Sequence, residues 1–275
     1  MKTILVPTDF SAVSVNAINY AVEIAKISNA KIILFNAYHL PIITSEVPII
    51  LPLDEMKQST MDRLKKIESQ IRSEFDSQFS IECNCSCGFP VQEINIFAQE
   101  NKVDMIIMGM EGASYLEEKF VGSTTTSVIS SSKVPVLAIN KNVKFHSIKK
   151  IVFACDYAQM NDLSAIDTLK ELSALFKAQI FVLNVVHELE TVPSVSKAIE
   201  GIKLNHLFKD IEHSFHSIQN EDIIDGINDF VNEKEIDLVM MIPRMHTLLR
   251  SIFSEPNTKR MAFHTKVPLL TLIEK

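Results

Sequence analysis

Glycine is scarce in this chain. Only 6 of its 275 residues are glycine, whereas ordinary usage of about 7% would give roughly 19. With only 10 prolines as well, the composition excludes a collagen-like or linker-rich chain. A hydrophobic content of 47% excludes a disordered chain, because it is enough to form a core. A local cluster of glycines in such a chain therefore indicates that the backbone at that place requires glycine.

Long apolar runs and a disulfide framework are also missing. No uninterrupted apolar run reaches the roughly 18 residues of a membrane-spanning helix. The first apolar run is short and ends at Pro7 and Asp9, which predicts a first strand rather than a signal peptide. Three of the 4 cysteines, Cys83, Cys85 and Cys87, are too close in sequence for ordinary disulfides. We expect a cytoplasmic protein with reduced thiols.

Neither half of the chain is basic. The formal net charge is −7; residues 1–141 hold 12 basic and 16 acidic side chains, and residues 142–275 hold 15 and 18. A surface for nucleic acid or an anionic membrane normally needs clustered positive charge. We therefore expect neither partner.

The chain contains two copies of one unit. Its last third matches the first copy without a gap at an offset of 133 residues, with identical pairs such as Asp104 and Asp237. The first strands match at an offset of 147, and the next predicted strands match at 148. We expect domains at 1–141 and 142–275 with a joint at 141–147. The first copy then carries about fifteen extra residues between its second strand and third helix.

Each copy alternates short apolar runs with helical patterns. Runs rich in Ile, Val and Leu suit parallel strands that are covered on both faces and joined by right-handed crossover helices. We therefore expect an α/β fold with two tandem doubly wound open sheets, in which ligands bind beyond the carboxyl ends of the strands. In the first copy we expect strands at 2–7, 31–37, 78–86, 104–109 and 134–140, and helices at 12–28, 54–75, 90–101 and 122–132.

Three of the six glycines, Gly109, Gly112 and Gly122, lie within fourteen residues of each other in the pattern G-x2-G-x9-G-S. The first ends a predicted strand, and the last precedes a predicted helix. Glycine lets the backbone approach a phosphate closely, and the free N–H groups of a helix N-terminus attract anions. The alternative is a tight strand exit followed by an ordinary helix cap. We favour a nucleotide site, because the whole set occurs in a glycine-poor chain.

The sequence resembles the universal stress protein family in its tandem two-domain form, over nearly its whole length. The marks are Ile-Leu-Val-Pro-Thr-Asp-Phe-Ser at 4–11, the glycine spacing, and Ser-Lys-Val-Pro-Val-Leu-Ala-Ile at 132–139. The resemblance implies a Rossmann-like five-stranded sheet of order 3-2-1-4-5 in each copy, paired through the fifth strands as an internal pseudo-dimer. It also implies that the first copy binds ATP, with Mg²⁺ left open.

The resemblance also implies which part of the nucleotide each pocket residue would contact. Asp9 would accept from the adenine amino group, and Ala37 would lie along the base. Pro7 and Thr8 would shape the pocket. Met108 and Gly109 would contact the ribose region, and the residues implied to cradle the phosphates are Gly112, Gly122, Ser123, Thr124 and Thr125.

Two positions leave alternatives open. Asp9 stands at a strand end before a helix, where aspartate is commonly a cap. Position 111 is often basic or His in ATP-binding members, whereas here it is Glu111. A carboxylate beside a triphosphate is repulsive unless a cation intervenes. Glu111 therefore points to solvent, as we expect, or helps to hold Mg²⁺, or lowers the affinity.

The second copy has lost the glycine loop. Its four corresponding positions carry side chains, and Pro256 also lacks an N–H donor. We expect that this half does not bind ATP in the family manner and is regulatory or scaffolding. Gly109, Gly112, Gly122 and Ser123 correspond to Ile242, Met245, Glu255 and Pro256.

Two further features have two interpretations each. Cys83, Cys85 and Cys87 alternate on a predicted strand; they could form a soft-metal or redox cluster, but buried apolar filling is the commoner role. A strand spreads positions i and i+4 by about 13 Å, so the three thiols cannot share one metal ion. The apolar, proline-rich segment 38–53 is either a lid or docking segment near the site, or packs on the domain pair or a dimer mate.

Catalysis has little support. The sequence holds no G-x-S-x-G, H-E-x-x-H or Walker loop motif, so we name no catalytic residue. The main expectation is a cytoplasmic, ATP-binding stress protein that signals through nucleotide-dependent contacts with partner proteins. The alternatives are a nucleotide-independent interaction module and a slow ATPase. Homodimer formation is left open.

Overall fold

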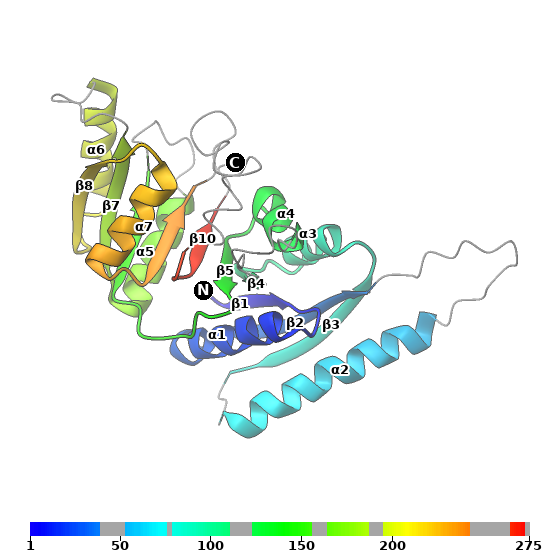
Figure 1. The fold of residues 1–275 in the computed structure, drawn as a ribbon. Coiled ribbons are helices and arrows are strands. Elements are labelled where there is room, and N and C mark those ends of the chain that lie inside the picture. The colour runs from blue at the N-terminus through cyan, green and yellow to red at the C-terminus, as the bar shows by residue number, and fades with distance from the viewer. Residues whose placement is uncertain are drawn as a thin grey trace, which may run out of the picture.

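The computed structural model describes residues 1–38, 53–75, 79–110, 123–155, 164–186, 195–242 and 265–272. Strands and helices alternate as the sequence predicts, and in the first copy all boundaries agree to within three residues (Figure 1). The first copy comprises β1 (Thr3–Pro7), α1 (Ala12–Ser28), β2 (Lys31–Tyr38), α2 (Leu53–Glu74), β3 (Ile81–Cys87), α3 (Pro90–Glu100), β4 (Met105–Met110), α4 (Ser123–Ser131) and β5 (Val136–Asn140). The second comprises β6 (Lys150–Ala154), α5 (Ser164–Phe176), β7 (Gln179–Val186), α6 (Val195–Leu207), β8 (His213–Gln219), α7 (Ile223–Lys234), β9 (Leu238–Met241) and β10 (Leu269–Thr271).

The strands of both copies form one continuous ten-stranded sheet. Its order is β3-β2-β1-β4-β5-β10-β9-β6-β7-β8. Strands pair in parallel within each half, and β5 pairs with β10 in antiparallel fashion. Each half therefore has the order 3-2-1-4-5, and the halves meet through their fifth strands. This confirms the predicted fold class and shows that the two sheets join edge to edge.

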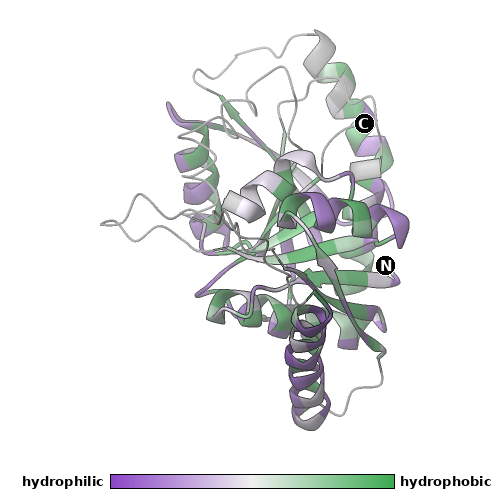
Figure 2. Ribbon diagram, turned by 90° about the vertical axis from the view of Figure 1, so that its right-hand side faces the viewer, coloured by the Kyte–Doolittle hydropathy of each residue, from purple (hydrophilic) through white to green (hydrophobic). Residues whose placement is uncertain are grey.

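Helices cover both faces of this sheet. On one face, side chains of α1, α2, α5 and α6 share a single core cluster that runs across both halves. On the other face, α3 and α4 cover the first half and α7 covers the second. Figure 2 shows the strands coloured as hydrophobic at the centre and the helices with hydrophilic outer faces. The apolar runs are thus explained by burial on both faces of the central strands.

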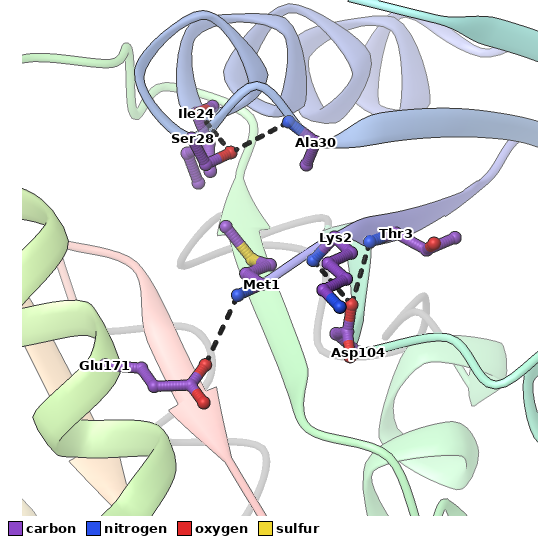
Figure 3. Close-up of polar contacts among 8 residues, drawn as sticks. All are labelled: Met1, Lys2, Thr3, Ile24, Ser28, Ala30, Asp104 and Glu171. Carbon is purple, nitrogen blue, oxygen red and sulfur yellow. Dashed lines mark hydrogen bonds and ion pairs between the residues drawn. The ribbon is translucent and has the colours of Figure 1, made fainter.

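Contacts around the joint tie the two halves together. Asn16 of α1 donates from Nδ2 to the carbonyl oxygens of Asn140 and Val143, at 3.2 and 2.9 Å. The N-terminal ammonium group of Met1 lies 3.4 Å from a carboxylate oxygen of Glu171 on α5 (Figure 3). The hydrogen bonds of Asn16 therefore hold the joint against the first half, and an ion pair links the two halves in addition to the sheet.

One aspartate has the same structural role in both copies. A carboxylate oxygen of Asp104 accepts the backbone N–H groups of Lys2 and Thr3, at 2.6 and 2.8 Å (Figure 3). Asp237 accepts the N–H groups at the start of β6, from residues 149 and 150, at 2.6 and 2.9 Å. The identity of this pair across the repeat is explained by the need to satisfy N–H groups at the start of the central strand of each half.

Candidate functional site

A cavity of about 390 Å³ opens at the carboxyl ends of β1, β2 and β4, beside the N-terminus of α1. This is where a doubly wound sheet is expected to bind ligands. Eight of the eleven predicted site residues line it: Pro7, Thr8, Asp9, Ala37, Met108, Gly109, Thr124 and Thr125. Residues from four elements far apart in sequence therefore meet in one hollow.

The other predicted positions are placed only in part. Ser123 is the first residue of α4. Gly112 and Gly122 lie outside the described residues, as does Glu111, whose alternatives stay open. The segment 39–52 lies outside them as well, so the structure does not choose between its two interpretations.

Thr8 organises the turn between β1 and α1. Its hydroxyl accepts the backbone N–H of Phe10 at 3.0 Å and lies 2.8 Å from the hydroxyl of Ser14. Its own N–H donates to the carbonyl of Phe35 at 2.8 Å. Phe10 adopts a φ of 67°, a left-handed conformation that is uncommon for a bulky residue. The turn that presents Asp9 is thus held by hydrogen bonds on both sides.

Asp9 supports the residue that caps α1, Ser11, and lines the cavity. Its Oδ1 accepts the N–H of Ser11 at 3.0 Å, and the Ser11 hydroxyl in turn accepts the N–H of Ser14 at 3.3 Å. Partial burial opposes ionisation of Asp9, but hydrogen bonds from the side chain and backbone of Ser11 outweigh it, so the pKa of Asp9 lies below its usual value. The carboxylate is therefore ionised at neutral pH and able to accept a hydrogen bond.

Gly109 lies where β4 meets the first turn of α1. A Cβ atom at this position would lie 2.5 Å from the carbonyl oxygen of Val13 and 2.8 Å from its carbonyl carbon. Real Cβ atoms essentially never approach backbone atoms so closely. The glycine therefore permits close packing of helix on strand, in addition to lining the cavity. The sequence pattern predicts only a tight strand exit or contact with a ligand at this position, and not this packing.

The hydroxyl of Thr125 is already engaged. It donates to the carbonyl oxygen of Gly109 at 2.8 Å, and the side chain is buried. This hydrogen bond links the start of α4 to the end of β4. Because the hydroxyl hydrogen is used in it, Thr125 would have to donate to a phosphate from its backbone N–H. Thr124, the residue before it, also lines the cavity.

Sequence reasoning missed several lining residues. Asn36 is buried in β2 and donates from Nδ2 to the carbonyl of Thr8 at 2.7 Å, which fixes the backbone beside Asp9. The signal was available, because Asn184 occupies the matching position in the second copy and a polar residue inside an apolar strand is unusual. Phe35 and Ile94 provide apolar lining from β2 and α3; nothing in the local pattern marked them.

Chemically, the described walls suit a flat heteroaromatic ring with polar edges. Phe35, Ala37 and Ile94 offer apolar surface, and Asp9 offers a charged acceptor. Among the described residues, no group of three His, Cys, Asp or Glu side chains is placed to hold a metal ion. Nor does any helix in the described ranges have the length and apolar character to cross a membrane.

The second copy differs at the corresponding place. Ile242, buried directly after β9, stands where the first copy has Gly109. A branched side chain could not occupy the space that Gly109 leaves for the backbone of α1 in the first copy. Met245, Glu255 and Pro256 lie outside the described residues.

The cysteines of β3 occupy three different environments. Cys85 is buried in the core, Cys87 is exposed, and the thiol of Cys83 donates to a carboxylate oxygen of Glu68 at 3.5 Å. Burial, reinforced by the negative charge of Glu68, raises the pKa of Cys83 to about 12. Cys83 is therefore a protonated, unreactive thiol.

Comparisons with known proteins agree with this architecture. The model of the universal stress protein family matches residues 1–140. A universal stress protein of Methanocaldococcus jannaschii is 30% identical over 151 residues, which cover 52% of this chain and 84% of the relative. The crystal structure of a universal stress protein from Archaeoglobus fulgidus superposes with a TM-score of 0.77 at 19% identity, covering 99% of this chain and 98% of that one. A second structure, of a putative universal stress protein from Pseudomonas aeruginosa, gives a TM-score of 0.63 at 14% identity and covers 99% of this chain and 93% of its own. The chain belongs to the universal stress protein family.

Proposed function

We propose that the first copy, residues 1–141, binds an adenine nucleotide, ATP in the first instance, in the cavity at the ends of β1, β2 and β4. The second copy, residues 142–275, does not bind ATP in this manner and acts as a regulatory or scaffolding half. Binding changes the contacts made with partner proteins in a cytoplasmic stress response. The signal depends on whether the cavity holds a nucleotide, and not on turnover of that nucleotide.

One observation carries the proposal: the residues implied by the family resemblance converge on a single cavity. Pro7, Asp9, Ala37 and Thr124 come from distant parts of the chain and line the same 390 Å³ hollow. The cavity is large enough for a purine with its sugar, because ligand pockets begin at about 300 Å³. The phosphates would extend toward the glycine loop at the start of α4, where N–H groups favour anions.

Each described residue then has a defined task. The ionised carboxylate of Asp9 accepts from the exocyclic amino group of adenine. Asn36 holds the carbonyl of Thr8 beside it, and the apolar side chains of Phe35 and Ile94 exclude water from the faces of the base. Mg²⁺, when bound, would neutralise phosphate charge.

Isothermal titration of ATP into nucleotide-free protein tests the proposal. Extraction with acid and chromatography first establish that the protein carries no nucleotide. Asp9→Asn should weaken binding about tenfold or more, since hydrogen bonds to charged groups contribute about 1.5–3 kcal/mol. Asp210→Asn, at an exposed position in the second half, is the matched control and should bind as the wild type does.

Absence of heat at millimolar ATP, with and without Mg²⁺, would sink the proposal and favour a nucleotide-independent interaction module. Phosphate release above the buffer rate that is lost in Asp9→Asn would identify a slow ATPase instead. Sedimentation with and without ATP would reveal whether two chains pair and whether occupancy changes that pairing.

A further inference from the structure

We propose that Arg63 of α2 is a positioning residue of the nucleotide site, which acts through the ring of Phe10 on the turn that carries Asp9. By this route, occupancy of the cavity is coupled to the order of α2. The inference rests on the proposed function for the identity of the ligand.

The turn between β1 and α1 is strained and depends on its neighbours. Phe10 has a φ of 67°, which favours glycine rather than a bulky side chain. Its N–H donates to the Thr8 hydroxyl and the N–H of Ser11 donates to Asp9 Oδ1, each at 3.0 Å. The Phe10 side chain is partly buried against the core that α1 and α2 share. A residue that packs on Phe10 therefore acts on the placement of Asp9.

Arg63 provides that packing. The central carbon of its guanidinium group lies 3.7 Å from the centroid of the Phe10 ring, well within the range of a cation–π contact. The planar guanidinium group can stack on the ring face, whereas a lysine ammonium group would offer only a point charge. The contact joins α2 to the turn, 53 positions apart in the chain.

Helix α2 is fully buried at only a few positions. Over 22 residues from Leu53 to Glu74, its buried residues are Thr60, Leu64 and Ile71, and Met61 and Ile67 pack against the core while partly exposed. Figure 1 shows the helix alongside β3 and β2, at the outer edge of the sheet. A long helix with so few buried side chains belongs to the less stable part of a structure. Since coupling is reciprocal, a ligand that stabilises the turn must also stabilise α2 through this contact.

The test compares Arg63→Ala and Arg63→Lys with Arg72→Ala. Arg72 lies on the same helix and pairs with Glu68 at 2.8 Å. Arg72→Ala therefore also removes one arginine and its side-chain contact from α2, and serves as the matched control. Hydrogen exchange without ligand measures the exchange rates of the backbone amides of Phe10 and Ser11. Titration with ATP reports the affinity, and exchange with saturating ATP reports the protection of α2.

In Arg63→Ala we expect faster hydrogen exchange at the turn and loss of the protection that ATP confers on α2. We also expect a two- to five-fold loss of ATP affinity, which corresponds to the free energy of one exposed cation–π contact. Arg63→Lys should lie between this variant and the wild type, and Arg72→Ala should match the wild type. Equal turn exchange in Arg63→Ala and Arg72→Ala would overturn the inference, as would equal ATP affinity. A wild-type protein that binds no nucleotide but shows the difference in turn exchange would overturn the proposed function and leave the contact between α2 and the turn established.

Discussion

Substitution of Gly109 by alanine tests the packing that builds the cavity. The added Cβ would lie 2.5 Å from the carbonyl oxygen of Val13, 2.8 Å from its carbonyl carbon and 2.9 Å from its Cγ1. Two of these three atoms belong to the backbone of α1, so a change of rotamer cannot relieve the contact. The N-terminus of α1 must move away from β4, and both elements line the cavity.

Overpacking of this kind costs about 1–3 kcal/mol. For a chain of this size, each kcal/mol lowers the melting temperature by about 2–4 °C. We therefore expect Gly109→Ala to melt several degrees lower and to bind ATP more weakly than the wild type.

Gly201→Ala is the matched control. Gly201 lies inside α6, and nothing lies within 4 Å of a Cβ placed there. The substitution should stabilise the helix by about 0.5–1 kcal/mol, because glycine in a helix interior is that much worse than alanine. Urea unfolding followed by circular dichroism measures both variants. A Gly109→Ala protein that is as stable as the wild type, or that shifts in the same direction as Gly201→Ala, would refute the packing role of Gly109.

Three further predictions follow from individual contacts. Asp104→Ala and Asp237→Ala should each lower the free energy of unfolding in urea by about 1–2 kcal/mol, because two backbone N–H groups lose a charged acceptor in either case. If both variants were as stable as the wild type, the shared role of these aspartates at the start of β1 and β6 would be contradicted. The depressed pKa of Asp9 means that its ionised form stabilises the fold above the pKa of the unfolded state, and that this contribution is lost as pH falls through the folded pKa. The stability advantage over Asp9→Asn should therefore hold at neutral pH and shrink as pH falls below about 4; an advantage that is the same at acid and neutral pH would show the assignment to be wrong. Alkylation at pH 8, followed by mass spectrometry, should modify exposed Cys87 before Cys83, whose pKa of about 12 leaves almost no thiolate; preferential labelling of Cys83 would disprove its inert state.

Much of the fold was predictable because its signals are local. The expected helix at 12–28 forms with those bounds, and Ser11 caps it by accepting the N–H of Ser14. The apolar runs at 31–37 and 104–109 form central strands that are buried on both faces. Periodicity and capping depend on near neighbours, so they can be read from the chain itself.

The candidate site was predictable only as a set of positions. Family resemblance pointed to Asp9 and Thr125, and both line the cavity. Their present hydrogen bonds could not be foreseen: Asp9 accepts from Ser11, and Thr125 donates to Gly109. Such contacts depend on how β4, α1 and α4 come together, and no local pattern encodes that geometry.

By itself, the sequence determined that two copies of one α/β unit follow each other and that only the first keeps a glycine loop, because repeats and residue identities need no coordinates. The resemblance implied that the copies pair through their fifth strands, but only the tertiary structure decided the antiparallel register of β5 and β10, with Leu270 opposite Leu137. It also decided why position 109 must be glycine: a carbonyl oxygen of α1, almost a hundred positions away in the chain, occupies the space of its missing Cβ. Contacts between distant segments follow from packing of the whole core, and packing is satisfied only once every element is in place.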